Sequence, residues 1–321
     1  MLSGGGTWPR EKKSSTLAEW VHMADAFWQA SMDVPEGEPA VPIIWGLDAV
    51  HGHNNVIGTT LFPHNIGLGA TRNVDLIREI GRITAREVAA TGQDWTFGPM
   101  VAVARDDRWG RTCESYSEDP ELVAACATAM VEGLQGTIGG EGFLGDQHLI
   151  ATAKHFLGDG GTEGGMDQGN SLASEEELRD IHGAGYFATL EAGVQTVMAS
   201  FSSWQGTRLH GFTELLTGVL KGQLGFDGFV VTDWNAYGQV PGCSNDSCPA
   251  AFNAGIDMFM VPQDWQALYE NTLSQVKTGE ISPERLDDAV RRILRVKMRS
   301  GLFDLGRPSS RPMGSRPQVV G

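Results

Sequence analysis

Short apolar segments rich in β-branched residues alternate with longer amphipathic segments along this chain of 321 residues. The alternation predicts parallel strands joined by right-handed helical crossovers, in a closed barrel or an open doubly wound sheet. We expect strands at 42–47, 96–100, 150–154, 196–200, 228–233 and 257–261, and a strand stub at 1–3. We expect helices near 17–28, 73–91, 119–135, 174–192, 212–224, 264–279 and 283–300.

Polar residues stand directly after several predicted strands, and they favour the barrel. Asp48, Lys154-His155, Ser202-Ser203 and Asp233-Trp234 occupy such positions. Side chains at the carboxyl ends of many different strands form the active sites of (β/α)8 barrels. An open dinucleotide-binding sheet would carry Gly-x-Gly-x-x-Gly between a strand and a helix, and the chain lacks this motif.

The length of the chain allows one large domain. We predict an α/β fold, a (β/α)8 TIM-type barrel over residues 1–305. Six clear strands and the stub make one strand fewer than eight, so we expect the barrel to be incomplete at its start. Residues 306–321 are rich in proline, serine, arginine and glycine, and we interpret them as a linker stub.

The composition excludes several classes of function. The 24 lysines and arginines against 40 aspartates and glutamates give a net charge of −16, which disfavours nucleic acid and anionic membrane surfaces as partners. The chain has no run of about 18 apolar residues, so the sequence predicts no membrane span. The first residues turn at once to glycine, without the apolar core of a signal peptide. The compartment and the oligomeric state stay open.

The four cysteines predict little chemistry. Cys113 and Cys126 lie in well-patterned segments and are interpreted as small buried side chains. Cys243 and Cys248 frame a polar loop, and their spacing allows a small disulfide or two metal ligands. No second Cys or His pair with zinc-like spacing appears. We expect no metal and no cofactor.

The segment 228–234 is the first candidate catalytic element. An apolar strand ends there in Asp233, and the indole of Trp234 follows. Asp233 could simply cap the next helix. However, an aromatic face at a carbohydrate site packs against the apolar face of a pyranose, and a strand-end carboxylate can attack an anomeric carbon. We therefore interpret Asp233 as a nucleophile.

The pair Lys154-His155 ends another apolar strand, where polar groups are costly unless they meet partners. Both side chains can donate hydrogen bonds to the hydroxyls of a sugar. The alternative is an ion pair between Lys154 and an aspartate that fixes the loop. A serine hydrolase would need a Gly-x-Ser-x-Gly elbow, and none occurs.

Two loops supply the remaining candidates. In the dense charged loop 106–120, Arg111 could point its planar fork at substrate hydroxyls while Glu114 holds it in orientation, although most such runs are solvated surface. In the loop 45–54, Asp48 could accept two hydrogen bonds from neighbouring sugar hydroxyls. The histidines of this region are interpreted as structural, each hydrogen-bonded near the barrel mouth; they are His51, His53 and His64.

Together these segments resemble glycoside hydrolase family 3, in its exo-β-glucanase and β-glucosidase branch. The resemblance covers nearly the whole chain. Its most specific motifs are Gly-Leu-Asp-Ala-Val-His-Gly-His-Asn at 46–54, Phe-Pro-His-Asn at 62–65, Arg-Trp-Gly-Arg at 108–111 with Glu-Ser-Tyr-Ser-Glu-Asp at 114–119, Lys-His-Phe at 154–156 and Val-Thr-Asp-Trp at 231–234.

The resemblance implies a retaining hydrolase with a covalent glycosyl-enzyme, acting on a small carbohydrate such as a β-glucoside or a β-gluco-oligosaccharide. It implies that Asp233 is the nucleophile and that Trp234 forms the wall of an adjacent subsite. Phe201 falls where related enzymes commonly carry a tyrosine, so one hydroxyl contact is expected to be missing. The implied ligands of the non-reducing terminal glucose are Asp48, Arg111, Lys154 and His155.

The resemblance also shows departures. In this branch a second α/β domain follows the barrel and supplies the acid/base glutamate, and we expect this chain to lack it. The Gly4-Gly5-Gly6 segment resembles the family's second barrel strand, so the first βα unit is expected to be missing. A branch of hexosaminidases takes its acid from a loop histidine, but residues 160–169 contain none.

These departures lead to three hypotheses. The first is the catalytic barrel of a β-glucosidase, poorly active alone on cellobiose or laminaribiose. The second is a non-catalytic or degenerate sugar-binding fragment. The third is a β-xylosidase in the same fold. Relatives are commonly periplasmic or secreted, but the sequence leaves linkage and sugar preference open.

Overall fold

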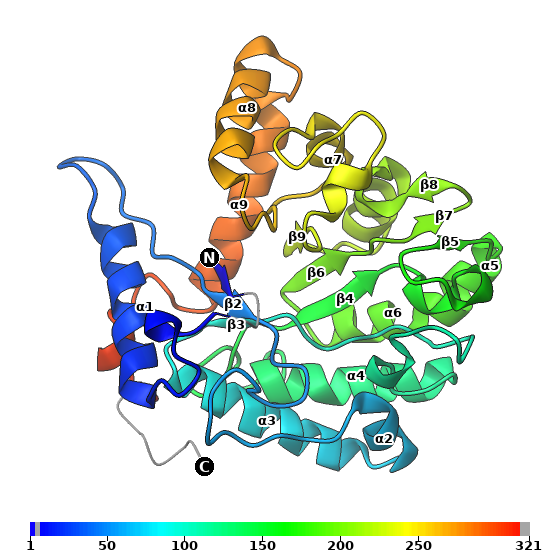
Figure 1. Cartoon of the computed structure of the whole chain (residues 1–321), viewed down its shortest axis with the longest axis horizontal. Coiled ribbons are helices and arrows are strands. Elements are labelled where there is room, and N and C mark those ends of the chain that lie inside the picture. Colours follow the sequence, from blue (N-terminus) through cyan, green and yellow to red (C-terminus); the bar gives the residue numbers. More distant parts are fainter. Residues whose placement is uncertain (4–6, 315–321) are drawn as a thin grey trace.

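The computed structural model of the chain describes residues 1–3 and 7–314. Its centre is a series of parallel strands in sequence order (Figure 1). Single parallel bridges join Trp95 to Ile150 and Val231 to Met258, and they extend the series to seven segments. The named strands of the series are β1 (Leu2–Ser3), β2 (Gly46–Leu47), β3 (Trp95–Thr96), β4 (Thr152–Phe156), β6 (Thr196–Ala199) and β9 (Phe229–Val231).

This series confirms the predicted α/β class with parallel strands. Every predicted strand segment contains a strand or a parallel bridge, and the stub at 1–3 pairs with β2. Gly4, Gly5 and Gly6 lie outside the described residues. The missing first βα unit and the incomplete closure of the barrel stay predictions.

Each predicted helical segment contains a helix, although the segment near 174–192 is divided. The helices are α1 (Leu17–Met32), α3 (Val74–Ala90), α4 (Pro120–Gln135), α5 (Glu175–Glu177), α6 (Ala184–Glu191), the π-helical Glu214–Gln223, α8 (Trp265–Thr278) and α9 (Pro283–Arg299). Between α5 and α6 the turns widen to a π-helix over Leu178–His182. No helix within the described residues has the length and apolarity needed to span a bilayer.

The starts of the helices follow from local sequence. The side chains of Thr16 and Ser174 each accept a hydrogen bond from a backbone amide of the first helical turn. The carboxylates of Glu19 and Glu177 each accept one from the backbone amide of the cap residue. Such reciprocal capping satisfies amide groups that have no partner inside the helix.

Several short elements were not predicted, because two to six residues carry too little periodicity to detect. They are α2 (Asn65–Ala70), α7 (Pro249–Ala254) and a small ribbon of β5 (Asn170–Ser171), β7 (Ser203–Trp204) and β8 (Thr207–Arg208). The ribbon branches from loops that follow β4 and β6, so it adds to the end of the sheet that carries the loops.

Two layers of buried side chains hold the strands in place. Inside the curve of the strands, the Trp95 indole donates to Thr152 Oγ1 at 2.7 Å and to Thr196 Oγ1 at 3.1 Å. Outside it, α3 and α4 lie side by side along the strands (Figure 1), and a large cluster of aliphatic residues fills the layer between. Both faces of the strands are therefore buried, as parallel sheets require.

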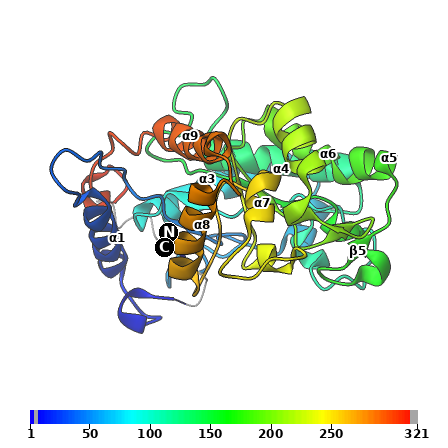
Figure 2. The same ribbon diagram turned by 90° about the horizontal axis from the view of Figure 1, so that it is seen from above.

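The predicted linker segment is described as far as residue 314. In that part, Arg307 bonds to Gln29, the Ser309 amide donates to Asp25, and Met313 is buried. The segment therefore packs against α1, which lies at the opposite end of the molecule from α5 in both views (Figures 1 and 2).

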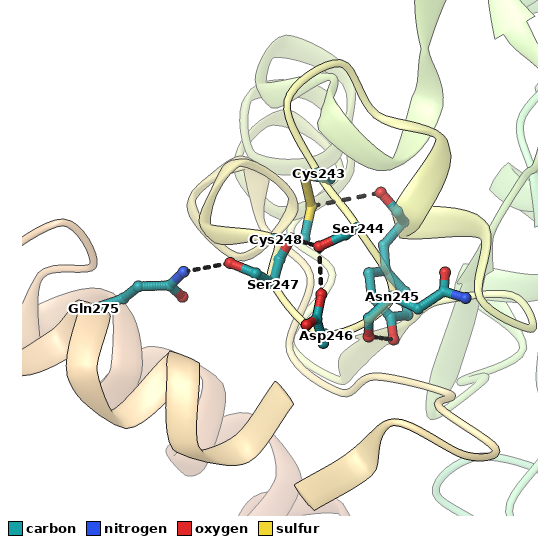
Figure 3. Close-up of a disulfide and its surroundings, with 8 residues drawn as sticks. Cys243, Ser244, Asn245, Asp246, Ser247, Cys248 and Gln275 are labelled. Atoms are coloured by element: carbon teal, nitrogen blue, oxygen red, sulfur yellow. Dashed lines mark hydrogen bonds between the residues drawn. A yellow bond between two sulfur atoms is a disulfide. The ribbon is translucent and has the colours of Figure 1, made fainter. Parts of the chain in front are cut away.

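Cys243 and Cys248 form a disulfide, so of the two open alternatives the disulfide is confirmed (Figure 3). Cys126 is a buried free thiol, as predicted, whereas Cys113 is partly exposed. The Ser247 hydroxyl within the disulfide loop accepts a hydrogen bond from Gln275 of α8. The loop that follows Asp233 is thereby fixed to a helix.

Candidate active site

The carboxyl ends of the parallel strands surround a pocket of about 330 Å³. All seven predicted site residues line it: Asp48, Arg111, Lys154, His155, Phe201, Asp233 and Trp234. They come from separate loops and strand ends, since Asp48 follows β2, the Lys154-His155 pair lies within β4 and Asp233 follows β9. Parallel strands place their carboxyl ends at one edge, which explains why residues far apart in sequence meet here.

Lys154 is almost fully buried, with 5% of its side chain exposed, and its Nζ donates to Asp48 Oδ1 at 2.7 Å. Asp48 is 49% exposed and keeps its other oxygen available to the pocket. The predicted alternative of a Lys–Asp ion pair is thus present, and both of its members face the cavity. A buried ammonium group needs such a partner.

Arg111 and Glu114 form a two-pronged ion pair, as predicted from the loop. Arg111 Nε lies 2.7 Å from Glu114 Oε1, and Arg111 Nη2 lies 3.0 Å from Oε2. Burial alone would raise the pKa of Glu114, but the hydrogen bonds and charge of Arg111 outweigh it and lower the pKa to about 2. Glu114 is therefore an anion that fixes the direction of the guanidinium.

Asp233 is the pocket carboxylate without a lysine or arginine partner among the described residues. Its side chain is 15% exposed. Its Oδ1 accepts from the Trp234 amide at 2.6 Å, and its own amide donates to His210 Nε2 at 3.1 Å. The carboxylate is held by its backbone and keeps Oδ2 directed toward the pocket, 3.4 Å from His155 Nε2.

His155 connects the pocket groups. Its Nδ1 lies 2.9 Å from Asp159 Oδ2, and its Nε2 lies 3.3 Å from Arg111 Nη2. Burial, followed by the charge of Arg111, lowers the pKa of His155 to about 3, so the ring is neutral near pH 7. Burial raises the pKa of Asp159 to about 6.

Apolar residues complete the pocket. Phe97, Met198 and Met260 belong to the layer inside the strands and line the pocket from below. Trp234 is 41% exposed at the rim. Fixed cationic donors and carboxylate acceptors above an apolar surface suit a ligand with many hydroxyl groups and one apolar face.

The remaining histidines are less uniform than predicted. His53 is fully buried and bonds to Thr91 Oγ1 at 3.0 Å, in agreement with a structural role. His51 and His64 contact each other through their rings, whose centroids are 4.5 Å apart. Within the described residues, no group of three or more His, Cys, Asp or Glu side chains could hold a metal ion.

Sequence reasoning missed three polar residues at or behind the pocket, as well as the apolar lining residues Val50, Phe97, Met198 and Met260. Gln168 lines the pocket, His210 accepts from the Asp233 amide, and Asp159 bonds to His155. Asp159 lies in the Gly-Asp-Gly-Gly segment that follows the Lys-His pair, so its position in the sequence was a usable signal. Gln168 lies in a loop and His210 in the short 3-10 helix Leu209–Gly211, and neither belongs to a motif.

Comparisons with known proteins agree with this geometry. A family model described as the glycosyl hydrolase family 3 N terminal domain matches residues 4–296. A lysosomal β-glucosidase of Dictyostelium discoideum is 35% identical over 280 residues, which are 84% of this chain and 34% of that protein. A β-xylosidase of Formosa agariphila is 33% identical over 311 residues, which are 92% of this chain and 43% of that protein.

Solved structures match the whole of the fold. A crystal structure of an exo-1,3/1,4-β-glucanase from a Pseudoalteromonas species matches with a TM-score of 0.97 and 57% identity, over 100% of this chain and 40% of that one. A β-glucosidase from Listeria innocua in complex with glucose matches with a TM-score of 0.81 and 28% identity, over 95% of this chain and 40% of that one. The chain thus spans between 34% and 43% of the length of these four relatives.

Proposed function

Because the chain belongs to glycosyl hydrolase family 3, we propose that it hydrolyses terminal non-reducing β-D-glucosyl residues of β-glucosides or β-glucans. The observation that carries this proposal is Asp233, a carboxylate without a cationic partner among the described residues, in a pocket of fixed donors and acceptors. The relatives named as β-glucosidases and as an exo-β-glucanase support the substrate class.

The proposed mechanism is a double displacement with retention. Asp233 Oδ2 attacks the anomeric carbon and forms an ester to it, while the bond to the leaving oxygen breaks and that oxygen takes a proton. Water then attacks the same carbon, loses a proton to the acid/base group and releases Asp233. The lack of a cationic partner favours this role, because a paired carboxylate would be a weaker nucleophile.

The proton donor is proposed to be a glutamate outside these 321 residues. Within the described pocket, the other two carboxylates are Asp48, which is bonded to the buried Lys154, and Glu114, which is bonded to the partly buried Arg111. Neutral His155, with a pKa near 3, holds no proton to give as a cation near pH 7. General acid assistance contributes roughly 10²–10⁴-fold, so this chain alone is expected to be poorly active on unactivated disaccharides.

The remaining site residues are proposed to bind the sugar. Asp48, Arg111, Lys154 and His155 contact hydroxyls of the terminal glucose, whereas Trp234 forms the wall of the next subsite. Phe201 adds an apolar contact in place of a hydroxyl. The barrel is proposed to span residues 1–305, as an incomplete (β/α)8 TIM-type barrel, with 306–321 as the connecting segment.

A β-xylosidase is the second candidate, and the relative of that name from Formosa agariphila favours it. Xylose lacks the exocyclic hydroxymethyl group of glucose. The two candidates are separated by measuring kcat/KM for aryl glucosides and aryl xylosides side by side. A preference for the xyloside would replace the glucosidase proposal.

The disulfide and the relatives named as periplasmic support a further proposal, that the chain works in an oxidising compartment. Secretion into the periplasm followed by thiol titration would test it. We expect two free thiols per chain after denaturation without reductant, from Cys113 and Cys126.

A fluorinated aryl glucoside that traps the glycosyl-enzyme tests the nucleophile directly. We expect a covalent adduct on Asp233, detected by intact mass and peptide mapping, and no adduct in the Asp233→Asn variant. A good aryl leaving group departs without protonation, so the trapping step does not need the glutamate proton donor proposed to lie outside these residues. Glucose binding by calorimetry without any adduct would support the non-catalytic sugar-binding alternative instead.

A further inference from the structure

Asp159 lies behind the pocket and outside the set of groups that face the sugar site. It begins a short 3-10 helix (Asp159–Gly161), separated from the end of β4 by two residues, and 9% of its side chain is exposed. Its two oxygens have different partners, because Oδ1 accepts from the Gly160 amide at 3.2 Å and Oδ2 lies 2.9 Å from His155 Nδ1. The carboxylate therefore has a fixed orientation, with one oxygen directed at the imidazole.

The surroundings of His155 decide which of its nitrogens carries the proton. A carboxylate oxygen at Nδ1 is an acceptor, whereas the guanidinium Nη2 of Arg111 at Nε2 is a donor. A proton on Nε2 would face that donor and leave Nδ1 against the carboxylate, with two lone pairs directed at each other. A proton on Nδ1 satisfies both contacts.

We propose that Asp159 is a positioning residue that holds His155 in the tautomer protonated at Nδ1, so that Nε2 faces the pocket as a hydrogen-bond acceptor. The same nitrogen lies 3.4 Å from Asp233 Oδ2, so two acceptors stand side by side at the floor of the pocket. A hydroxyl placed between them can donate to either one.

The consequence for the sugar rests on the proposed function. Lys154 and Arg111 can only donate hydrogen bonds, so with His155 as a further donor Asp233 Oδ2 would be the acceptor left beside it for hydroxyl protons. With Asp159 in place, His155 Nε2 accepts a hydrogen bond from a sugar hydroxyl instead. Asp159 thereby selects ligands that present a hydroxyl, over ligands that present only an acceptor, at this position.

The tautomer is measurable without any activity. In the 15N-histidine-labelled full chain, long-range 1H–15N correlation spectra distinguish a protonated from an unprotonated ring nitrogen. We expect the His155 signals, assigned by their loss in His155→Gln, to show Nδ1 protonated and Nε2 unprotonated near pH 7. A spectrum with the proton on Nε2 would overturn the proposal, whatever the chain does to sugars.

Asp159→Asn tests the cause. The Gly160 amide keeps the amide oxygen of the new side chain at the Oδ1 position, so its NH2 group faces His155 Nδ1 and forces the proton to Nε2. Asp94→Asn is the matched control, since Asp94 is as buried, with 8% of its side chain exposed, and bonds Arg311 away from the pocket. We expect the tautomer to change in Asp159→Asn and to stay unchanged in Asp94→Asn; an unchanged tautomer in both would contradict the assigned role.

Binding of monodeoxyfluoro glucoses completes the test, because fluorine can accept but not donate a hydrogen bond. We expect one of these analogues to bind the wild-type chain roughly tenfold more weakly than glucose, the equivalent of one lost hydrogen bond. This penalty should vanish in Asp159→Asn and persist in Asp94→Asn. The same penalty in the wild-type chain, Asp159→Asn and Asp94→Asn would exclude the selective role of Asp159. Failure of glucose itself to bind would refute the proposed function, and the NMR spectra would then still test the tautomer of His155.

Discussion

The three carboxylates of the pocket differ in what holds them, and this decides what each can do. Asp48 has one oxygen on a buried ammonium group, and Glu114 has both oxygens on a guanidinium. The Asp233 carboxylate contacts the Trp234 amide and the neutral imidazole of His155. Asp48 and Glu114 are therefore suited to orienting other groups, whereas Asp233 is free to react.

Replacing Glu114 with glutamine should weaken sugar binding without unfolding the chain. The amide has one oxygen for two guanidinium donors, so Arg111 loses its fixed direction. We expect roughly tenfold lower affinity for glucose by calorimetry, the equivalent of one hydrogen bond to a charged group. Glu132→Gln breaks a comparable pair with Arg78, remote from the pocket, and should change the affinity less than twofold. Equal effects of the two substitutions would contradict the role of Glu114.

Seven of the residues that line the pocket were predicted from the sequence. Asp48, Lys154-His155 and Asp233 were visible as changes from apolar to polar side chains at strand ends, whereas Phe201 was inferred from the family resemblance. The sequence was also sufficient for the Glu114–Arg111 pair, whose members are three residues apart. The contact between His210 and Asp233 joins residues 23 apart in sequence. No periodicity encodes such a contact, since it depends on how two loops fold above the strands.

At the level of elements, the contact between α3 and α4 depends on two glycines. A Cβ on Gly133 would lie 2.3 Å from the Arg78 carbonyl oxygen and 2.9 Å from the Gly81 Cα. These atoms are backbone of the facing helix and cannot rotate away. The close approach of the two helices therefore requires the absence of a side chain.

Gly133→Ala should lower the free energy of unfolding by about 1–3 kcal/mol, the usual cost of overpacking a close contact. Gly218→Ala is the control, because that position is exposed in a helical segment and a Cβ there meets nothing within 4 Å. It should raise stability by about 0.5–1 kcal/mol, through helix propensity. Urea unfolding of both variants measures the difference, and a destabilised Gly218→Ala would show that propensity alone does not describe this segment.

Elements with long periodic segments were predicted well, whereas the small ribbon of β5, β7 and β8 was not. Its strands have two residues each. They lie in the loops after β4 and β6 and pair with one another, not with the strands of the main parallel series. Ser202-Ser203 was noted only as polar sequence after a strand. The pairing of Ser203 with Arg208 and of Trp204 with Thr207 depends on tertiary context.

For the whole molecule, the parallel order of the strands can be predicted from the sequence, but the pKa shifts that burial causes cannot. Three histidines are fully enclosed, and burial lowers the pKa of each to about 3; they are His53, His155 and His210. Enclosure is a property of the finished fold, because exposed and buried histidines look alike in sequence. The consequence is global, since all three gain their ordinary pKa on unfolding.

Stability should therefore fall as the pH falls from 7 to 5. As the pH falls, a histidine whose folded pKa is depressed binds its proton first in the unfolded chain. Its contribution to the free energy of unfolding is therefore fully present above about pH 6.5 and is lost as the pH falls toward 3. Asp159, whose folded pKa is raised to about 6, acts in the opposite direction over the range from about 6 to 3.8. Counted over these four groups alone, three protons less one leave about two near pH 5, which corresponds to roughly 2.7 kcal/mol per pH unit. Burial also lowers the pKa of His51, His148 and His182 and raises that of Asp94, and these groups add contributions of both signs.

Urea unfolding between pH 7 and pH 5 at constant ionic strength measures this slope. His53→Gln removes one of the three histidines at a position that does not line the pocket, and it should reduce the slope to about half, that is, to roughly 1.4 kcal/mol per pH unit. His22→Gln, at an exposed position of α1, should leave the slope unchanged. A free energy of unfolding that stays constant or rises toward pH 5 would mean that the enclosed histidines are protonated in the folded chain. In that case His155 could not be the neutral acceptor that the pocket requires, so this measurement on the whole molecule also tests the chemistry of the site.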